Sequence, residues 1–452
     1  MSQTATPDLE RGLKNRHIQM IALGGAIGTG LFYGSAASIQ LVGPGIIVSY
    51  LIGGLVIYLI MRMLGEMSTE EPVAGAFSHF AYKYWGEFPG FLAGWNYWFL
   101  YVLVSMAELT VVGLYVSYWF PDFPAWASAL IVLVSVTGLN LLNVRFFGEM
   151  EFWFALVKVL AVVGMIVLGI AVIVLGLGGE ATGVSNLWSH GGFFPNGVNG
   201  LLLSLVVIMF SFGGTELIGI TAGEADDPKT SIPRAVRQVM WRILIFYVGA
   251  LTVMMILFPW NQVGMEGSPF VTIFSKLGIG SAAHILNFVV LTAAISVYNS
   301  GMYSNGRMLY SLAEQGNAPR IFTRLSANRV PYAAILFSSA CTLVIVGINL
   351  LIPEGAFMKV MAVATAAATI TWAMIIIVHL KFRKARSGKA TTFPAPFYPL
   401  ANYLCLAFLA LVLVMMSQME QMRDAILILP LWLGLLWIGF RARQRTTTGQ
   451  LV

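Results

Sequence analysis

Apolar and polar positions alternate in long blocks along this chain. Runs of about 20 apolar residues, each long enough to cross roughly 30 Å of hydrocarbon as a helix, recur from one end to the other. We count twelve such runs, at residues 18–37, 44–64, 90–118, 126–143, 153–176, 198–221, 240–259, 284–304, 332–352, 356–379, 399–417 and 425–440. The pattern predicts an all-α integral membrane protein with 12 transmembrane helices. No linker divides the chain, so residues 1–452 are expected to form a single domain.

Glycine interrupts two of these segments. Segment one contains Gly24-Gly-Ala-Ile-Gly-Thr-Gly30, and segment six contains Phe210-Ser-Phe-Gly-Gly214. Each glycine costs about 0.5–1 kcal/mol relative to alanine inside a helix, so we expect both stretches to unwind. Unwound backbone survives in a bilayer only where protein buries it or where it lines a cavity. Close helix packing is the alternative explanation, but it does not need four glycines in seven residues. The pair of breaks therefore predicts the substrate site of a secondary transporter.

The two breaks open two halves of similar size. Segments one to five span about 18–176 and segments six to ten span about 198–379. An odd number of spans per half forces the halves into opposite orientations, which predicts a 5+5 inverted repeat with discontinuous helices 1 and 6. Helices 11 and 12, at about 399–440, are additions. Between the spans, 65–86 predicts a cytoplasmic interfacial helix and 270–277 predicts an external cap.

Composition and charge narrow the class of protein. The chain is 58% hydrophobic and only 10% charged, which excludes an ordinary soluble enzyme. The net charge of +6 does not indicate nucleic-acid binding, because about 22 of the 26 Lys and Arg lie on one side of the predicted topology. That side is cytoplasmic when both termini are inside. The basic clusters are Arg11/Lys14/Arg16, Lys229/Arg234/Arg237/Arg242, Arg307/Arg320/Arg324/Arg329, Lys381/Arg383/Lys384/Arg386/Lys389 and Arg441/Arg443/Arg445.

Cofactor and catalytic signatures are missing from the sequence. Cys341 and Cys405 both lie in apolar spans, and the five His are scattered without metal-ligand spacing. The glycines of segment one are not followed by the Lys-Ser/Thr of a phosphate-binding loop. We therefore predict no metal, no cofactor and no direct use of ATP. A membrane enzyme would need convergent catalytic residues, and no span supplies them. A channel would need rings of identical groups, and the two non-identical breaks argue against that.

Several motifs resemble one family. They are Arg11-Gly-Leu-Lys-Asn-Arg-His-Ile-Gln19, Gly24–Gly30, Gly65-Glu-Met67, Phe147-Gly-Glu-Met-Glu-Phe-Trp-Phe154, Phe210–Gly214, Gly223-Glu-Ala-Asp-Asp-Pro228 and Ser231-Ile-Pro-Arg234. Together they resemble the bacterial amino-acid permeases of the amino acid–polyamine–organocation (APC) superfamily. Residues 71–86 and Gly94-Trp-Asn-Tyr-Trp98 look most like the aromatic amino-acid and phenylalanine-specific permeases.

The resemblance implies a LeuT-like fold and proton-coupled uptake across the bacterial inner membrane by alternating access. The implied substrates are amino acids with aromatic side chains (Phe, Tyr, Trp). A permease of the same family for proline or another neutral amino acid, and an amino-acid exchanger, stay open as alternatives. A channel or facilitator is the rival from a different class. The expected partners are the amino acid, protons and the lipid bilayer, and the sequence leaves the oligomeric state open.

Matching the two breaks to the family pattern assigns the substrate contacts. The resemblance places the substrate carboxylate on the hydroxyl and N–H of Thr29 and on the N–H groups of Gly28 and Gly30, where a half-helix begins. It places the ammonium on backbone carbonyls of the two breaks. It also implies an aromatic residue that covers the bound substrate and a pocket for the substrate side chain. These remaining residues are Ala26, Phe210, Ser211 and Gly213 for the carbonyls, Phe210 for the cover, and Tyr101 and Tyr298 for the pocket.

Three ionisable residues lie well inside the spans, namely Glu108, Lys158 and Glu216. A charge at the bilayer centre costs about 2.5–3.5 kcal/mol on insertion scales, so each needs a partner or a purpose. The resemblance puts Lys158 where sodium-coupled relatives hold a cation, which implies proton coupling. Its ammonium would donate to a carbonyl near Gly24 or Gly25 and to the hydroxyl of Ser296 or Ser300. The alternative is a structural Lys–Glu pair; Glu108 and Glu216 would orient the breaks, pair with Lys158 or share the proton.

Overall fold

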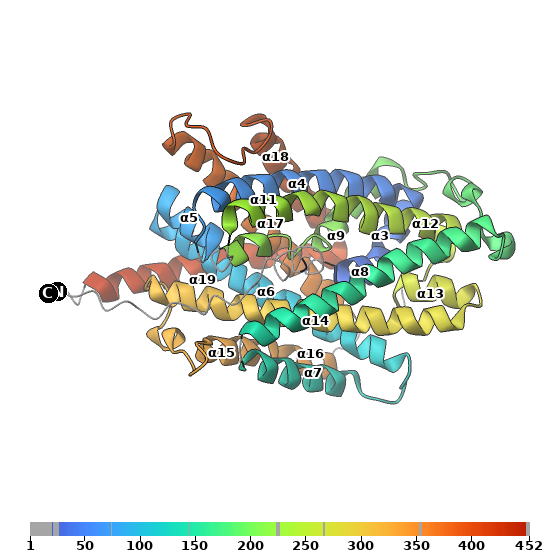
Figure 1. Cartoon of the computed structure of the whole chain (residues 1–452), viewed down its shortest axis with the longest axis horizontal. Helices are drawn as coiled ribbons and strands as arrows, with labels where there is room; N and C mark the ends of the chain where they lie inside the picture. Colours follow the sequence, from blue (N-terminus) through green and yellow to red (C-terminus); the bar gives the residue numbers. More distant parts are fainter. Residues whose placement is uncertain are drawn as a thin grey trace.

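A computed structural model describes Met20 and residues 27–73, 75–142, 144–222, 227–264, 267–351 and 355–448. All regular structure in these ranges is helical, and most helices run along the long axis of the molecule (Figure 1). The α-helices are α2 (Thr29–Phe32), α3 (Gly34–Val42), α4 (Ile46–Glu70), α5 (Ala76–Tyr84), α6 (Glu87–Ser117), α7 (Ala125–Asn140), α8 (Val144–Val174), α9 (Gly197–Phe210), α10 (Leu217–Thr221), α11 (Pro228–Arg242), α12 (Ala250–Leu257), α13 (Pro269–Lys276), α14 (Gly280–Glu314), α15 (Tyr332–Thr342), α16 (Val344–Leu351), α17 (Ala356–Ala385), α18 (Leu400–Gln418) and α19 (Glu420–Thr448). Short 3-10 turns are η1 (Gly43–Gly45), η2 (Gly179–Ala181), η3 (Val184–Leu187), η6 (Trp260–Gln262) and η7 (Arg320–Thr323), and η5 (Ile243–Gly249) is π-helical.

Long apolar helices dominate the described part of the chain. Nine of its helices are long and apolar enough to cross a membrane, and α7 and α9 are shorter apolar helices. The large apolar side chains on outward faces, such as Leu160, Val167 and Leu431, are exposed because hydrocarbon would surround them. The chain is therefore an all-helical, multi-pass membrane protein, as the hydrophobic runs predict.

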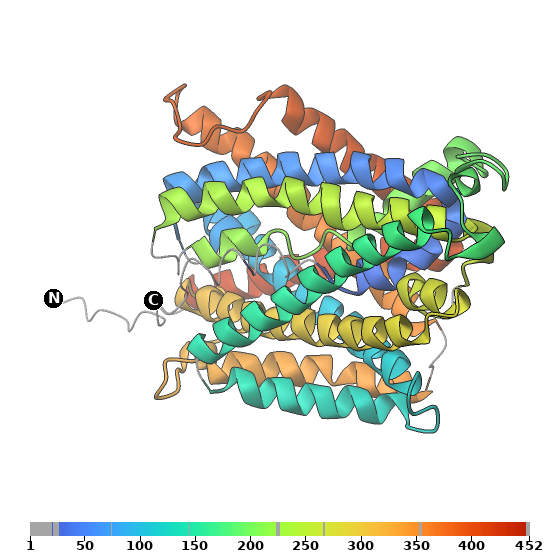
Figure 2. The ribbon, with the colours of Figure 1, turned by 45° about the vertical axis from the view of Figure 1, so that its right-hand side comes forward.

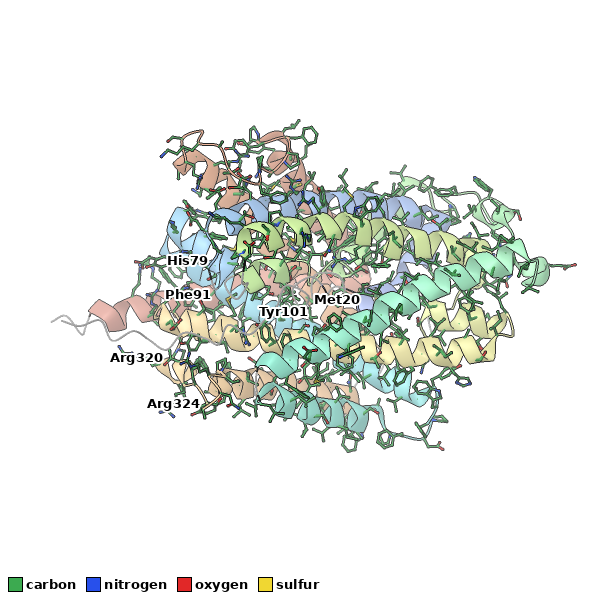
Figure 3. All side chains as sticks on the ribbon, viewed as in Figure 1. Met20, His79, Phe91, Tyr101, Arg320 and Arg324 are labelled. Carbon is green, nitrogen blue, oxygen red and sulfur yellow. The ribbon has the colours of Figure 1, made fainter. Side chains whose placement is uncertain are left out.

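The two ends of the molecule differ in their elements. At one end lie α5, η7 and the loop between α17 and α18; we call this the α5 end (Figures 1 and 2). The opposite, α13 end holds α13, η3 and the connection between α6 and α7. His79, Arg320 and Arg324 all lie at the α5 end, whereas Tyr101 lies near the middle of the long axis (Figure 3).

Helix α6 lies at the centre of the bundle and packs along α14 and α17. Its contact with α14 is close, because a Cβ added at Gly301 would lie 3.0 Å from Ser105 Oγ and 3.2 Å from Tyr101 Cδ1. A side chain larger than glycine at this position would push the two helices apart. This packing holds the polar face of α6 in the interior.

One connecting segment departs from the prediction made for it, and a second, for which no element was predicted, is helical. Gly65 and Glu66 belong to the end of α4, so only α5, which begins at Ala76 after the left-handed Gly75 (φ 80°), corresponds to the predicted interfacial helix. The segment before span seven is also helical, since α11, η5 and α12 run continuously from Pro228 to Leu257. The cap expected at 270–277 corresponds to α13.

Candidate functional site

The second glycine segment is interrupted as predicted. Helix α9 ends at Phe210, α10 begins at Leu217, and turns join them. Gly214 has φ +93°, a backbone conformation that residues with a Cβ rarely adopt. The break therefore depends on glycine at this position.

The first glycine segment enters the described part of the chain at Ile27. Gly28 is extended (φ −133°, ψ −158°), α2 begins at Thr29, and the helix stops again at Tyr33 before α3. Gly24, Gly25 and Ala26 lie outside the described residues, so the carbonyl of Ala26 predicted to bind the ammonium is not placed. From Ile27 onward, this segment contains one short turn of helix, α2, before α3.

The two breaks touch each other directly. A Cβ added at Gly30 would lie 2.6 Å from Ser211 Cα and 2.9 Å from Ser211 N. Real Cβ atoms do not approach backbone this closely, so only glycine fits. The structure thus brings the predicted residues Thr29, Gly30 and Ser211 to one place.

Helix α6 supplies a carboxylate to the first break. The hydroxyl of Thr29 donates to Glu108 Oε1 at 2.9 Å, and the N–H of Thr29 reaches the same oxygen at 3.4 Å. Both Thr29 groups assigned to the substrate carboxylate are therefore engaged by a side chain of the protein. Glu108 is 2% exposed.

The same helix also reaches the second break. The hydroxyl of Tyr101 donates to Glu216 Oε1 at 3.3 Å, and the N–H of Gly214 donates to the same oxygen at 3.2 Å. Tyr101 and Glu108 are seven residues apart, two helical turns, and so share one face of α6. That face therefore links the two breaks.

Two tyrosines hold Ser211 from the other side. Tyr50 on α4 bonds to Ser211 Oγ at 2.9 Å, and Tyr247 in η5 donates its hydroxyl to the Ser211 carbonyl at 2.9 Å. Their rings stack at 5.3 Å. The Phe210 carbonyl likewise accepts the N–H of Gly213 at 3.1 Å. The carbonyls of Ser211 and Phe210, two of the four assigned to the ammonium, thus already accept one bond each, and each keeps its second lone pair.

Lys158 is fully buried on α8 among acidic side chains. Its ammonium is attracted by the carboxylates of Glu151 and Glu108 and repelled by Arg242. Ser296, one of the two hydroxyls predicted to accept from Lys158, donates to Glu151 Oε1 at 2.6 Å. The Ser300 hydroxyl has no hydrogen-bond partner among the described residues, so the prediction that Lys158 donates to it is wrong.

Aromatic rings separate Phe210 from a cavity toward the α13 end. The Phe210 ring meets the Phe357 ring edge to face at 6.1 Å, and Phe357 meets Tyr33 at 4.8 Å. Phe357 and Tyr33 also line a cavity of about 430 Å³ that reaches Asp122. Tyr298, in contrast, faces Thr137 on α7. The structure therefore groups Phe210 and Tyr101 with the breaks and directs Tyr298 toward α7.

Comparison with known proteins decides the family. The chain matches the profile of the family described as "Amino acid permease" over residues 17–451. The chain belongs to this family. The aromatic amino acid transport protein AroP of Escherichia coli strain K12 is 56% identical over 440 residues, covering 97% of this chain and 96% of that protein. AroP of Salmonella typhimurium strain LT2 is 54% identical over 98% of both chains. The amino acid permease YtnA of Bacillus subtilis is 50% identical over 95% of this chain and 94% of its own length.

Membership settles the class of this permease. Its relatives are transport proteins of bacteria, so the chain is a transporter and not an enzyme. Together with nine apolar helices in the described ranges, this identifies a multi-pass protein of the bacterial inner membrane.

Two further charged residues of the permease are buried, and neither was predicted to be. Glu151 is fully buried seven residues before Lys158, so the two share a face of α8. That spacing was visible in the sequence and is the signal that could have found it. Arg242, counted above among cytoplasmic basic residues, is only 1% exposed and interacts electrostatically with Glu216 and Tyr247. No local pattern signals its burial, because it ends an amphipathic, basic helix.

Proposed function

We propose that this permease takes up aromatic amino acids (Phe, Tyr, Trp) together with protons across the cytoplasmic membrane. The single observation that carries the substrate class is the 56% identity, over 97% of the chain, to a protein named for aromatic amino acid transport. The geometry adds support for a carrier mechanism: two interrupted segments meet at Gly30 and Ser211 within a packed bundle. Alternating access would expose this meeting point to one side of the membrane at a time.

The proposed architecture is a single domain of 12 spans, with a LeuT-like 5+5 inverted repeat and two further helices. Nine long apolar helices support it, together with the shorter α7 and α9 and the interruption of Gly34–Glu70 by η1. Both termini are proposed to be cytoplasmic. The α5 end would then be the cytoplasmic end, which agrees with Arg320 and Arg324 lying there.

The substrate head group is proposed to bind where the breaks meet. Thr29, with the N–H groups of Gly28 and Gly30, would hold the carboxylate, and the carbonyls of Phe210, Ser211, Gly213 and the undescribed Ala26 would hold the ammonium. The side-chain pocket would include Tyr101, which already contacts Glu216 beside the second break. Tyr298 is the weaker assignment, because it faces α7.

Phe210, Phe357 and Tyr33 are proposed to close the site from outside. Their edge-to-face contacts form a continuous aromatic layer between the second break and the 430 Å³ cavity. Rotation of Phe210 away from Phe357 would open a path from that cavity to Ser211. An aromatic substrate would replace the lost ring contacts while it passes.

Proton coupling is proposed to use Lys158, Glu108 and Glu216. All three are buried near the breaks, and the electrostatic contact between Lys158 and Glu108 joins α8 to the first break. A buried group of this kind favours one protonation state strongly and changes it when its neighbours change. Substrate binding is such a change.

The test is uptake of labelled phenylalanine into proteoliposomes with an imposed inward proton gradient, in competition with all twenty amino acids. We expect Phe, Tyr and Trp to compete best, and accumulation to collapse with the gradient. Lys158→Met is expected to remove the dependence on the gradient. Equal competition by Pro and Phe would contradict aromatic selectivity, and unchanged coupling in Lys158→Met would contradict its role.

The other transport modes are distinguished in the same vesicles. An exchanger would take up label only when the vesicles are preloaded with amino acid. A channel would show no acceleration by preloaded substrate, because it has no carrier state that must return.

A further inference from the structure

The carboxylate of Glu108 engages the Thr29 donors that the proposed function assigns to the substrate carboxylate. Its Oε1 accepts the Thr29 hydroxyl at 2.9 Å and faces the Thr29 N–H at 3.4 Å. The space is tight, since a Cβ added at Gly28 would lie 2.9 Å from this oxygen. The Thr29 hydroxyl and N–H can therefore donate to only one carboxylate at a time.

The second oxygen of the same carboxylate is unused. Glu108 Oε2 is buried and has no hydrogen-bond partner among the described residues. A buried carboxylate oxygen without a donor is costly, and ligands or protons commonly satisfy such atoms. Ser105, one turn away on the same face of α6, also has a buried hydroxyl that finds no partner in the described part of the chain. The site thus holds a carboxylate that is half satisfied.

We propose that Glu108 acts as a stand-in for the substrate carboxylate and that its protonation transfers the Thr29 donors to the substrate. The inference rests on the proposed function of the permease. A proton from the external water adds to Oε2 and makes Glu108 a neutral carboxyl. The Thr29 O–H and N–H then leave Oε1 and donate to the incoming carboxylate, and the new Oε2–H donates to it as well. On the cytoplasmic side the substrate leaves, the proton leaves to water, and the Thr29 donors return to Oε1.

The charges around Glu108 stay balanced during this exchange. Lys158 on α8 is the charged group that attracts Glu108, and Glu151 and Arg242 act on that lysine in turn. Tyr115 on α6 interacts with Glu108 from its own helix, and α14 presents the apolar Val297 to this place. Before the exchange Lys158 faces the Glu108 carboxylate, and afterwards it faces the substrate carboxylate. One proton therefore accompanies each zwitterion, and one net charge moves inward.

The test measures binding to the purified, full-length permease at a series of pH values. If one proton enters with each substrate, the affinity for phenylalanine weakens by up to about tenfold per pH unit as the pH rises from about 5.5 to about 8.5. The amine 2-phenylethylamine, which is phenylalanine without its carboxylate, is expected to bind with no such dependence. This comparison needs no substitution and so does not depend on the folding of a variant.

The variant Glu108→Gln is expected to bind phenylalanine with a pH-independent affinity, and Glu71→Gln at the α5 end is the matched control that keeps the dependence. Equal pH dependence for phenylalanine and its amine, or an unchanged slope in a folded Glu108→Gln, would overturn the inference. If the wild type prefers another amino acid, the proposed aromatic selectivity fails, and the same comparison with that amino acid and its decarboxylated amine decides the inference. Binding of no amino acid at all would overturn both.

Discussion

At the scale of single residues, the site depends on the absence of a side chain at Gly30. A methyl group there would lie 2.6 Å from the Cα of Ser211, which is backbone and cannot turn aside. The two breaks would have to separate by several tenths of an ångström. Because both breaks carry the donors and acceptors proposed for the substrate, this separation would reach the site directly.

Gly30→Ala is therefore expected to lower transport strongly while the protein still inserts. Overpacking of this kind costs about 1–3 kcal/mol, which corresponds to roughly 5- to 150-fold in uptake rate. The measurement is initial uptake normalised to the amount of permease in the membrane. Gly347→Ala on α16 is the control, because nothing lies within 4 Å of its added Cβ. Equal uptake by both variants would show that the breaks do not need this contact.

Single residues also differ in how far their place can be predicted from the sequence. Thr29, Gly30, Ser211 and Lys158 could be singled out, because glycine runs and a charge in an apolar span are local signals. That Glu108 engages Thr29 could not be predicted, since it requires knowing which face of α6 turns toward the first break. The same reason hides the burial of Arg242, which is a property of the neighbouring helices and not of α11.

At the scale of elements, the turn between α4 and α5 is held by an acidic residue just outside the span. The Glu71 carboxylate accepts a hydrogen bond from the ammonium of Lys83 at 2.8 Å and another from the hydroxyl of Tyr84. Burial raises the pKa of Glu71, but the hydrogen bonds from Lys83 and Tyr84 and the charge of Lys83 outweigh it, so the pKa lies below its usual value. The ionised form is thus favoured in the folded state.

This lowered pKa gives a sign for the pH dependence of stability. A carboxyl with a lowered folded pKa stabilises the fold above its unfolded pKa, and the contribution is lost as the pH falls through the folded value. Glu71→Gln should therefore lower the thermal unfolding temperature at pH 7, and this effect should shrink as the pH falls below about 4.3, the usual pKa of a glutamate. Because the pair is partly exposed, we expect about 0.3–1 kcal/mol. Glu180→Gln on exposed η2 is the control, and an effect that grows as the pH falls would contradict the assignment.

Elements were predictable where they are apolar and less so where they leave the membrane. The apolar runs located the long helices, since burial in lipid requires about 20 apolar residues. They did not show that α4 extends to Glu70 or that α11 begins at Pro228, because both extensions are polar. Tertiary partners stabilise the extension of α4: the N–H of Thr392 donates to Glu70 at 2.7 Å.

At the scale of the whole molecule, one buried carboxylate joins three helices and a loop at the α5 end. Glu66 on α4 accepts His379 Nε2 at 2.9 Å and the N–H of Ala395 at 2.7 Å, and it pairs with Arg383 at 2.8 Å. His379 in turn bonds to Asn402 on α18 at 3.0 Å. The loop before α18 is thereby fixed to α4 and α17.

Glu66→Gln should loosen this end of the molecule. Removing the charge leaves buried donors unpaired, which typically costs about 3–5 kcal/mol. We expect a lower unfolding temperature and faster cleavage by trypsin at the exposed Lys389. Glu70→Gln, one turn further along α4 and more exposed, should have a smaller effect. Protection of Lys389 equal to that of the wild type would contradict the proposed role of Glu66.

The orientation of the molecule in the membrane can be tested with one position in this loop and one near η3. In a variant with Cys341 and Cys405 replaced by Ser, a cysteine at exposed Ser189 should react in intact cells with a maleimide that cannot cross the membrane. A cysteine at exposed Lys389 should react only after the cells are opened. The reverse pattern would invert the proposed topology.

Helix α6 also limits how the length of this permease can evolve. It is unbroken from Glu87 to Ser117, and one inserted or deleted residue between Tyr101 and Glu108 would turn one of them about 100° away from its break. Residues between Tyr101 and Glu108 can be substituted as long as the stretch stays apolar, but an insertion or deletion there would misplace one of these two side chains. Among related permeases, variation in length should therefore accumulate in connections such as residues 175–196 and spare the stretch between these two side chains.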